Sequence, residues 1–148
     1  MADVSRGVST VLGYTINLTV ATLLISGLLF ATGNLVEDQR RQAVRAEMTV
    51  VAERTVANLE AADRLSRAAN NGHIRVHTAL PRRLAGVGYR ITIAVDGSNA
   101  TAILATDDPS VRVTVPINNE TAIQPTTVNG GSFIVTWNAT EPLVVHDG

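Results

Sequence analysis

The residues that could act in catalysis or bind a metal are few and lie far apart along the chain. The 148 residues include three histidines and no cysteine, which excludes thiolate metal sites and thiol nucleophiles. His73 and His77 stand in HIRVHTA, whose pattern predicts a strand, and two imidazoles without a third ligand are more often surface residues than a metal site. Asp107-Asp108-Pro109-Ser110 is typical of a turn, and Gly86-Val-Gly88 lacks the strand-to-helix context of a phosphate loop. We therefore predict no enzyme active site, no metal, no cofactor and no small-molecule substrate.

The distribution of charge argues against nucleic acid as a partner. The formal net charge is −1, and all twelve basic residues are arginine. Domains that bind nucleic acid concentrate basic side chains in a patch or stripe, and the sequence shows no such stripe. No nucleic-acid partner is expected.

The sequence does contain a candidate site at which another protein could cut this chain, Arg6-Gly7-Val8 near its start. Arg6 is followed by a run that holds no acidic or basic side chain until Glu37. Three interpretations are open: the flank of a secretory signal, the flank of a permanent anchor, or a processing site that turns the run into an assembly element. A helix needs about 20 apolar residues to cross a bilayer, and this run exceeds that length. It is also longer than the apolar core of a cleaved signal, for which Ala31-Thr32-Gly33 is the nearest cleavage site.

Small hydroxyl residues recur within the run at helical spacing. Thr15, Thr19, Thr22 and Ser26 are four, three and four residues apart, which places them on one face of a helix. Small residues let helices approach closely in lipid, and hydroxyls can bond across the contact or back to the backbone. We interpret this face as a helix–helix contact. The alternative is that threonines are merely tolerated in a single span.

Residues 37–72 continue as an amphipathic helix, with no proline and no glycine before Gly72. Residues at a spacing close to 3.5 form one stripe: Val44, Met48, Val51, Thr55, Leu59, Ala62, and Leu65 or Ser66. Acid-first pairs four residues apart, such as Asp63 with Arg67, predict a solvated opposite face. A single helix from Val8 to Asn70 would be about 90–95 Å long, at a rise of 1.5 Å per residue.

After Gly72 the period changes to the alternation of β-strands. Tyr89–Val95, Val111–Val115 and Phe133–Trp137 alternate apolar with other residues, Pro142–His146 predicts a short closing strand, and turn residues separate these segments. The predicted fold class is α+β, with the long N-terminal helix packed on a small C-terminal antiparallel β domain. We expect these residues of the stripe to be buried: Val44, Met48, Val51, Leu59 and Leu65. Their expected partners are Ile91, Ile93, Val113, Val115, Phe133 and Val135.

Three sequons lie in or near predicted turns of the β domain, and we expect their asparagines to be exposed to solvent: Asn99, Asn119 and Asn138. Together they favour an exported domain and are candidate N-glycosylation sites. The positive-inside rule opposes this orientation mildly, because arginines 40, 41 and 45 follow the run while Arg6 alone precedes it.

The order of parts resembles an archaeal type IV pilin or pilin-like protein, which has a very short leader, an uncharged helix, an amphipathic continuation and a β headgroup. The stretch Arg6-Gly-Val-Ser-Thr-Val-Leu-Gly13 resembles the start of haloarchaeal pilins, where a basic residue and a glycine or alanine precede the hydrophobic helix. Leu80-Pro-Arg-Arg-Leu-Ala-Gly86, running into Tyr89-Arg-Ile91, resembles an uncharacterised haloarchaeal pilin-like family. Thr10 departs from the proline frequent in that motif. Polar residues early in the helix favour a minor pilin or pseudopilin over the main filament subunit.

The resemblance implies that a prepilin peptidase recognises Arg6 and Gly7 and cuts the Gly7–Val8 bond. It divides the chain into a leader (1–7), a transmembrane and assembly helix (8–36), an amphipathic continuation (37–72) and a β headgroup (73–148). It also implies a chain anchored in the cell membrane or incorporated in a surface filament, with the C-terminal domain outside the cell. The partners would be other pilin-like subunits, contacted through the N-terminal helix. The implied function is that of a structural subunit in a type IV pilus-like appendage or secretion system.

Two other kinds of protein fit the same residues. One is an uncleaved single-span membrane protein with an extracellular accessory or sensory β domain, whose 44–65 stripe would pair with a second copy as a coiled coil. The other is a secreted β-domain protein cut near Gly33. The mature mass distinguishes them, because a pilin lacks residues 1–7 whereas the uncut anchor keeps them or loses only Met1.

Overall fold

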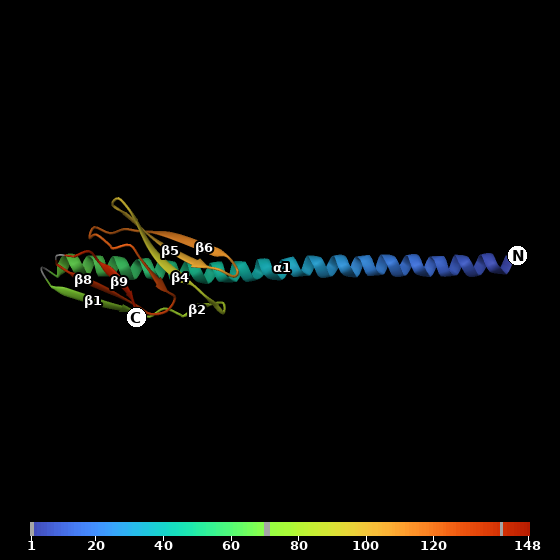
Figure 1. Cartoon of the computed structure of the whole chain (residues 1–148), viewed down its shortest axis with the longest axis horizontal. Helices are drawn as coiled ribbons and strands as arrows, with labels where there is room; N and C mark the ends of the chain where they lie inside the picture. Colours follow the sequence, from blue (N-terminus) through green and yellow to red (C-terminus); the bar gives the residue numbers. More distant parts are fainter. Residues whose placement is uncertain (1, 70–71, 140) are drawn as a thin grey trace. The chain divides into compact units, whose positions relative to one another are not determined.

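The computed structural model describes residues 2–69, 72–139 and 141–148, and for residues 2–10 and Asn34 it describes the backbone alone. One long helix, α1 (Ala2–Ala68), precedes the strands (Figure 1). Contacts divide the chain into two compact units, Met1–Gln39 and Arg40–Gly148, and α1 contributes to both. No proline occurs before Pro81, so no residue of α1 lacks the backbone N–H that the helical ladder needs.

The described part of the first unit is helix, and its described side chains from Val11 to Val36 are exposed. The large apolar ones between Val11 and Val36 range from 50% exposed at Val20 to 78% exposed at Phe30. Among the described side chains of this unit, therefore, the large apolar ones are not packed against other parts of the unit.

The second unit holds the last half of α1 and all the strands, which are paired antiparallel in two sheets and a small hairpin. The four-stranded sheet has the order β6 (Val111–Ile117), β5 (Asn99–Thr106), β4 (Arg90–Asp96), β7 (Thr126–Asn129). The three-stranded sheet has the order β1 (His73–Thr78), β8 (Phe133–Asn138), β9 (Val144–Asp147). The hairpin pairs β2 (Arg83–Leu84) with β3 (Val87–Gly88). Figure 1 shows strands of both sheets lying alongside the green half of α1.

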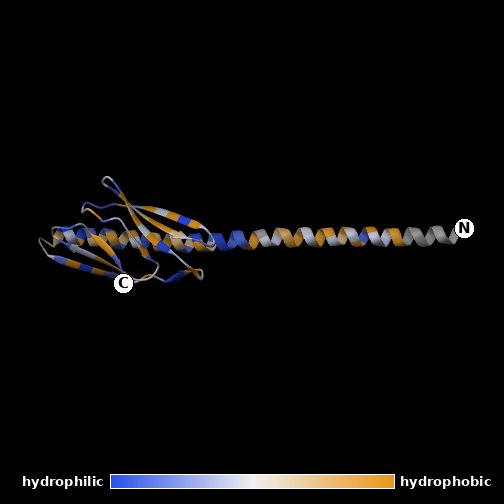
Figure 2. Cartoon of the chain, in the orientation of Figure 1, coloured by the Kyte–Doolittle hydropathy of each residue, from blue (hydrophilic) through white to orange (hydrophobic). Residues whose placement is uncertain are grey.

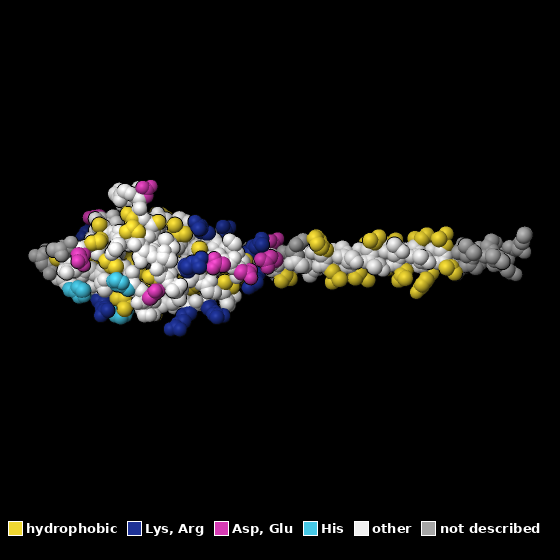
Figure 3. Space-filling model, in the orientation of Figure 1, with side chains coloured by type: hydrophobic (Ala, Val, Ile, Leu, Met, Phe, Trp, Pro, Cys, Tyr) yellow, Lys and Arg dark blue, Asp and Glu magenta, His cyan; other side chains and the backbone are white. Residues whose placement is uncertain are grey.

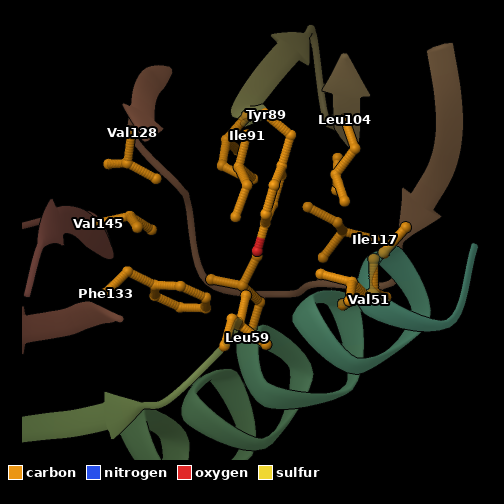
Figure 4. Packing of buried hydrophobic residues seen from close by; sticks show 14 of the residues in the cluster. Val51, Leu59, Tyr89, Ile91, Leu104, Ile117, Val128, Phe133 and Val145 are labelled. Carbon is orange, nitrogen blue, oxygen red and sulfur yellow. The ribbon is translucent and has the colours of Figure 1, made fainter. Parts of the chain in front are cut away.

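The core of this unit forms where the apolar stripe of α1 meets the inner faces of the sheets (Figure 4). Val51 and Leu59 point from the helix towards side chains of both sheets, among them Ile91 and Phe133. Strand alternation supplies the opposing surface, because Ala100, Ala102 and Leu104 of β5 face inwards in register with β4. The predicted α+β layout is confirmed.

The predicted stripe is confirmed along its length, with Thr55 and Ala62 buried as well, and its last position falls on Ser66. The separate expectation that Leu65 is buried is wrong. Val44, Met48, Val51 and Leu59 are buried, whereas Leu65 is 51% exposed and Ser66 is buried in its place. Ser66 stands seven residues after Leu59 and so stays on the buried face, while Leu65 is rotated about 100° from Ser66.

Among the predicted partners, the four on β4 and β8 are buried. Val113 and Val115 are only partly buried against the core, because β6 is the edge strand of its sheet and has no neighbour on its outer side.

Tyr89 and Gly130 make a close backbone approach beside β4. The Tyr89 hydroxyl donates to the Pro81 carbonyl at 2.7 Å, and the Gly130 N–H donates to the Tyr89 carbonyl at 2.8 Å. A Cβ atom on Gly130 would lie 2.4 Å from Cε1 of the Tyr89 ring, so only glycine fits without displacing the ring. Burial raises the pKa of the Tyr89 hydroxyl, and a hydrogen bond from the Gly131 backbone opposes that rise.

Candidate functional site

The strongest candidate site is the apolar segment of α1, residues 11–36. Within the described part of the chain, α1 is the one helix long and apolar enough to cross a membrane, and its qualifying window has a mean hydropathy of 1.7 with none of it buried. Figure 2 shows this segment mostly orange, followed by a blue stretch where the acidic and basic residues that come after the segment stand. An apolar surface of this kind is removed from contact with water either by a bilayer or by packing against other apolar helices.

The hydroxyl residues of this segment are exposed along the helix. They include the four residues of the predicted contact face, Thr15, Thr19, Thr22 and Ser26. Three of these hydroxyls already have acceptors, because Thr15, Thr19 and Thr22 donate to the carbonyls four residues earlier at 2.8–2.9 Å. Each such threonine therefore presents a methyl group and an oxygen acceptor rather than a free donor. A contact through this face would depend on small size and close approach, and it stays a prediction.

The backbone of the predicted processing residues, Arg6, Gly7 and Val8, forms part of the first turns of α1. Their side chains are outside the described residues, so the recognition role of Arg6 and Gly7 stays a prediction.

A polar cluster, the helix–loop clasp, joins the end of α1 to the loop after β6. It consists of Glu60, Asp63, Ser66 and Arg67 of α1 together with Asn118–Thr121. One Asp63 oxygen accepts the Thr121 N–H at 2.7 Å and the Glu120 N–H at 3.3 Å. The other pairs with Arg67 at 3.3 Å. Glu60 accepts two hydrogen bonds from Asn118, and the Ser66 and Thr121 hydroxyls share a bond of 2.9 Å.

Asp63 is the buried charge at the centre of the clasp. Its side chain is only 2% exposed, so the prediction that this ion pair belongs to a solvated face is wrong for Asp63. Burial by itself raises the pKa of the carboxyl, but hydrogen bonds from Thr121 and Glu120 and the charge of Arg67 outweigh that effect. The net result is a pKa below the ordinary value, which keeps Asp63 ionised in the folded chain.

The clasp also decides the environment of one sequon. Asn99 and Asn138 are exposed at the ends of β5 and β8. Asn119 is only partly exposed, its Nδ2 donates to the Thr121 carbonyl at 2.9 Å, and its Oδ1 is buried. The prediction of an exposed turn is therefore wrong for Asn119, because the loop that carries it is held against α1. Glycosylation itself stays a prediction at all three.

The remaining residues considered for chemistry are accounted for by ordinary structure. His73 and His77 lie on the exposed face of β1, as the strand pattern predicts, and His77 is paired through Ile134 with His146 of β9. Asp107 stands in a turn between β5 and β6, and its carboxylate binds the Arg90 guanidinium through two hydrogen bonds of 2.9 and 3.2 Å.

A family comparison covers both parts of the chain. The profile of a family of unknown function, DUF7266, matches residues 3–146. The chain belongs to this family. The match includes the apolar helix as well as the β unit. Comparisons with curated proteins and with solved structures find no match to the chain.

Proposed function

We propose that this DUF7266 protein is a pilin-like structural subunit, a minor pilin or pseudopilin of a type IV pilus-like appendage or secretion system. A membrane peptidase would remove residues 1–7, the apolar segment would anchor the chain and then join other apolar helices, and the β unit would be displayed outside the cell. The observation that carries this proposal is a single helix with two opposite environments. Its first part leaves its apolar surface open, and its last part is buried in a β core.

The size of the open surface supports assembly or membrane insertion over a free helix in water. Fourteen large apolar side chains between Val11 and Val36 are at least half exposed. Burying such a side chain fully contributes roughly 1.5–3 kcal/mol, so the segment as a whole represents on the order of 20 kcal/mol. That is more than the net free energy of unfolding of a typical domain, which is about 5–15 kcal/mol.

The other part of α1 argues against a coiled-coil stalk. The Val44–Ser66 stripe is already packed on strands of its own chain. Pairing with a second copy through the same stripe would require that core to open. A subunit that associates through residues 11–36 needs no such change, because those side chains are available.

The leader must be removed for this assembly to form. Arg6 carries a charge that would have to enter an apolar helical core, and an unpaired buried charge costs several kcal/mol or more. Cleavage between Gly7 and Val8 leaves a helix without an acidic or basic side chain before Glu37. The new α-amino group is then the one charge left to accommodate at the start.

The test is the terminus of the protein isolated from its native host. Gly7→Leu should block cleavage and leave a precursor in the membrane fraction that is heavier by residues 1–7. The matched control is Gly13→Leu, since Gly13 lies in the same helix and has no neighbouring atom within 4 Å of an added Cβ. It should be cut like the parent.

The intact mass and N-terminal sequencing distinguish the three candidate proteins. A mature chain that begins at Val8 in the parent and in Gly13→Leu supports the proposal. A parent chain that still begins at Met1 or Ala2 would reject it in favour of the uncut anchor. Cleavage near Gly33 would instead indicate a secreted β domain.

A further inference from the structure

The three sequons of the β unit stand far apart in the sequence, but the fold brings them to one end of the second unit. Asn99 forms with Asp96 the last pair before the β4–β5 turn. The next pair on β5 includes the last residue of β6, so Asn119 follows β6 at the same end. Asn138 is the last residue of β8 and pairs with His73, the first residue of β1. All three sequons therefore lie towards the end of the unit at which α1 stops.

Two of the three side-chain amides are free in the folded chain. Asn99 and Asn138 are exposed, and neither amide has a hydrogen-bond partner among the described residues. Figure 3 shows the β4–β5 hairpin, which carries Asn99 at its turn, projecting from the body of the unit. The third residue of the other sequon, Thr140, lies outside the described residues. A substituent on the amide nitrogen of Asn99 or Asn138 can extend into water.

The helix–loop clasp binds every residue of the third sequon. Asn119 Nδ2 donates to the Thr121 carbonyl at 2.9 Å, and its Oδ1 is buried. The N–H groups of Glu120 and Thr121 donate to Asp63, and the Thr121 hydroxyl shares a bond of 2.9 Å with Ser66. A sugar on Nδ2 would have to find room beside an amide oxygen that water does not reach. Modification of Asn119 therefore requires this part of the clasp to open.

We propose that the clasp selects the sites of N-glycosylation, so that the folded protein carries glycans on Asn99 and Asn138 and none on Asn119. The inference rests on the proposed export of the β unit. In the transfer, the amide nitrogen forms a bond with C1 of a sugar that is carried on a polyprenyl phosphate lipid. The bond from C1 to the phosphate oxygen breaks, the lipid leaves with its phosphate, and the nitrogen releases one proton.

This selection has a consequence for the surface of the unit. N-linked glycans are bulky and solubilising. Glycans on Asn99 and Asn138 would cover the end at which α1 stops. Contacts with other subunits would then be left to the sides and the opposite end of the unit.

The experiment analyses the full-length chain purified in detergent from its native host. Glycopeptide mass spectrometry measures the fraction of each sequon that is modified. We expect most copies to carry a glycan on Asn99 and on Asn138. Occupancy of Asn119 should be lower by about 10-fold or more, because modification there breaks buried hydrogen bonds.

A pair of α1 variants tests whether the clasp is the cause. Glu60→Ala with Ser66→Ala removes two of the side chains that hold the loop. The matched control is Glu53→Ala with Thr49→Ala, which removes a carboxylate and a hydroxyl from α1 outside the clasp, where the Thr49 hydroxyl bonds within the helix. Trp137 fluorescence checks that both variants remain folded. Occupancy of Asn119 should rise about 10-fold in the test variant and stay at the parent level in the control.

The pattern in the parent decides the proposal even where the test variant does not fold. Equal occupancy of Asn119 and the other two sequons would overturn the selection. A parent without a glycan on Asn99 or Asn138 would overturn the proposed sites. A folded test variant that stays unmodified at Asn119 would reject the clasp as the cause.

N-terminal sequencing of the same sample tests the proposed function separately. A chain that begins at Val8 but carries no glycan refutes this inference alone. A glycosylated chain that begins at Met1 or Ala2 refutes the pilin-like subunit and leaves the glycan sites in place. A chain that keeps its leader and carries no glycan refutes both.

Discussion

Leu59 and Leu65 are the same residue on the same helix, but the fold buries one and exposes the other. Leu59 is 0% exposed within the core cluster, and Leu65 is 51% exposed. Truncating each to alanine removes the same atoms and leaves a residue with high helix propensity. The pair therefore isolates the contribution of tertiary packing between α1 and the sheets.

The expected difference is large compared with the stability of the unit. A buried Leu→Ala change costs about 2.7–5 kcal/mol, from lost transfer free energy and the cavity left behind. A surface change away from special features stays within about 0.5 kcal/mol. For a cooperative unit of roughly 110 residues, the unfolding entropy converts the cost of Leu59→Ala into a fall in Tm of about 12–22 °C. Leu65→Ala should shift Tm by about 2 °C at most.

Trp137 gives a suitable signal for this comparison. It is the only tryptophan of the chain and packs against the core from β8, so its fluorescence follows the second unit and not the apolar segment. Thermal unfolding of the full-length variants in a mild detergent measures both Tm values. Equal Tm values for Leu59→Ala and Leu65→Ala would refute the packing of α1 on the sheets.

Two further predictions concern the buried charge and the orientation. Asp63→Asn should lower the free energy of unfolding at pH 7 by roughly 1–3 kcal/mol, with Asp96→Asn as the exposed control. Because the folded pKa of Asp63 lies below 3.8, its contribution is present above the unfolded pKa and is lost as the pH falls from about 5 through that lowered value. Chemical unfolding across this range should show a shallower acid loss in Asp63→Asn, and an unchanged profile would contradict the buried ion. For the orientation, Asn99→Cys and Asn138→Cys in this cysteine-free chain should react with an impermeant thiol reagent on intact cells, while Phe30→Cys in the span should not. Protection of both until lysis would reverse the proposed topology.

In the β unit, some local sequence signals are too weak to predict the strands. β5 reads NATAILAT, and its alanines have little preference for strands, so its position in the middle of the four-stranded sheet was not predicted. β7 has four residues, and the hairpin strands have two each. Segments this short hold too few residues for a period to be recognised. The division into two sheets likewise depends on pairs far apart in the chain, such as β1 with β8.

The sequence by itself determined the features that depend on neighbours within a few turns. These are the long helix, the uncharged run, the stripe from Val44 to Leu59 and the alternating strands, because 3.6-residue and two-residue periods are local properties of the backbone. Only the tertiary structure decided that Asp63 and Ser66 are buried and that Asn119 is held in the clasp. Each of these outcomes requires α1 to meet a segment more than fifty residues away in the chain. A helical period says which face is apolar, but it does not say which loop will supply the hydrogen bonds at the edge of that face.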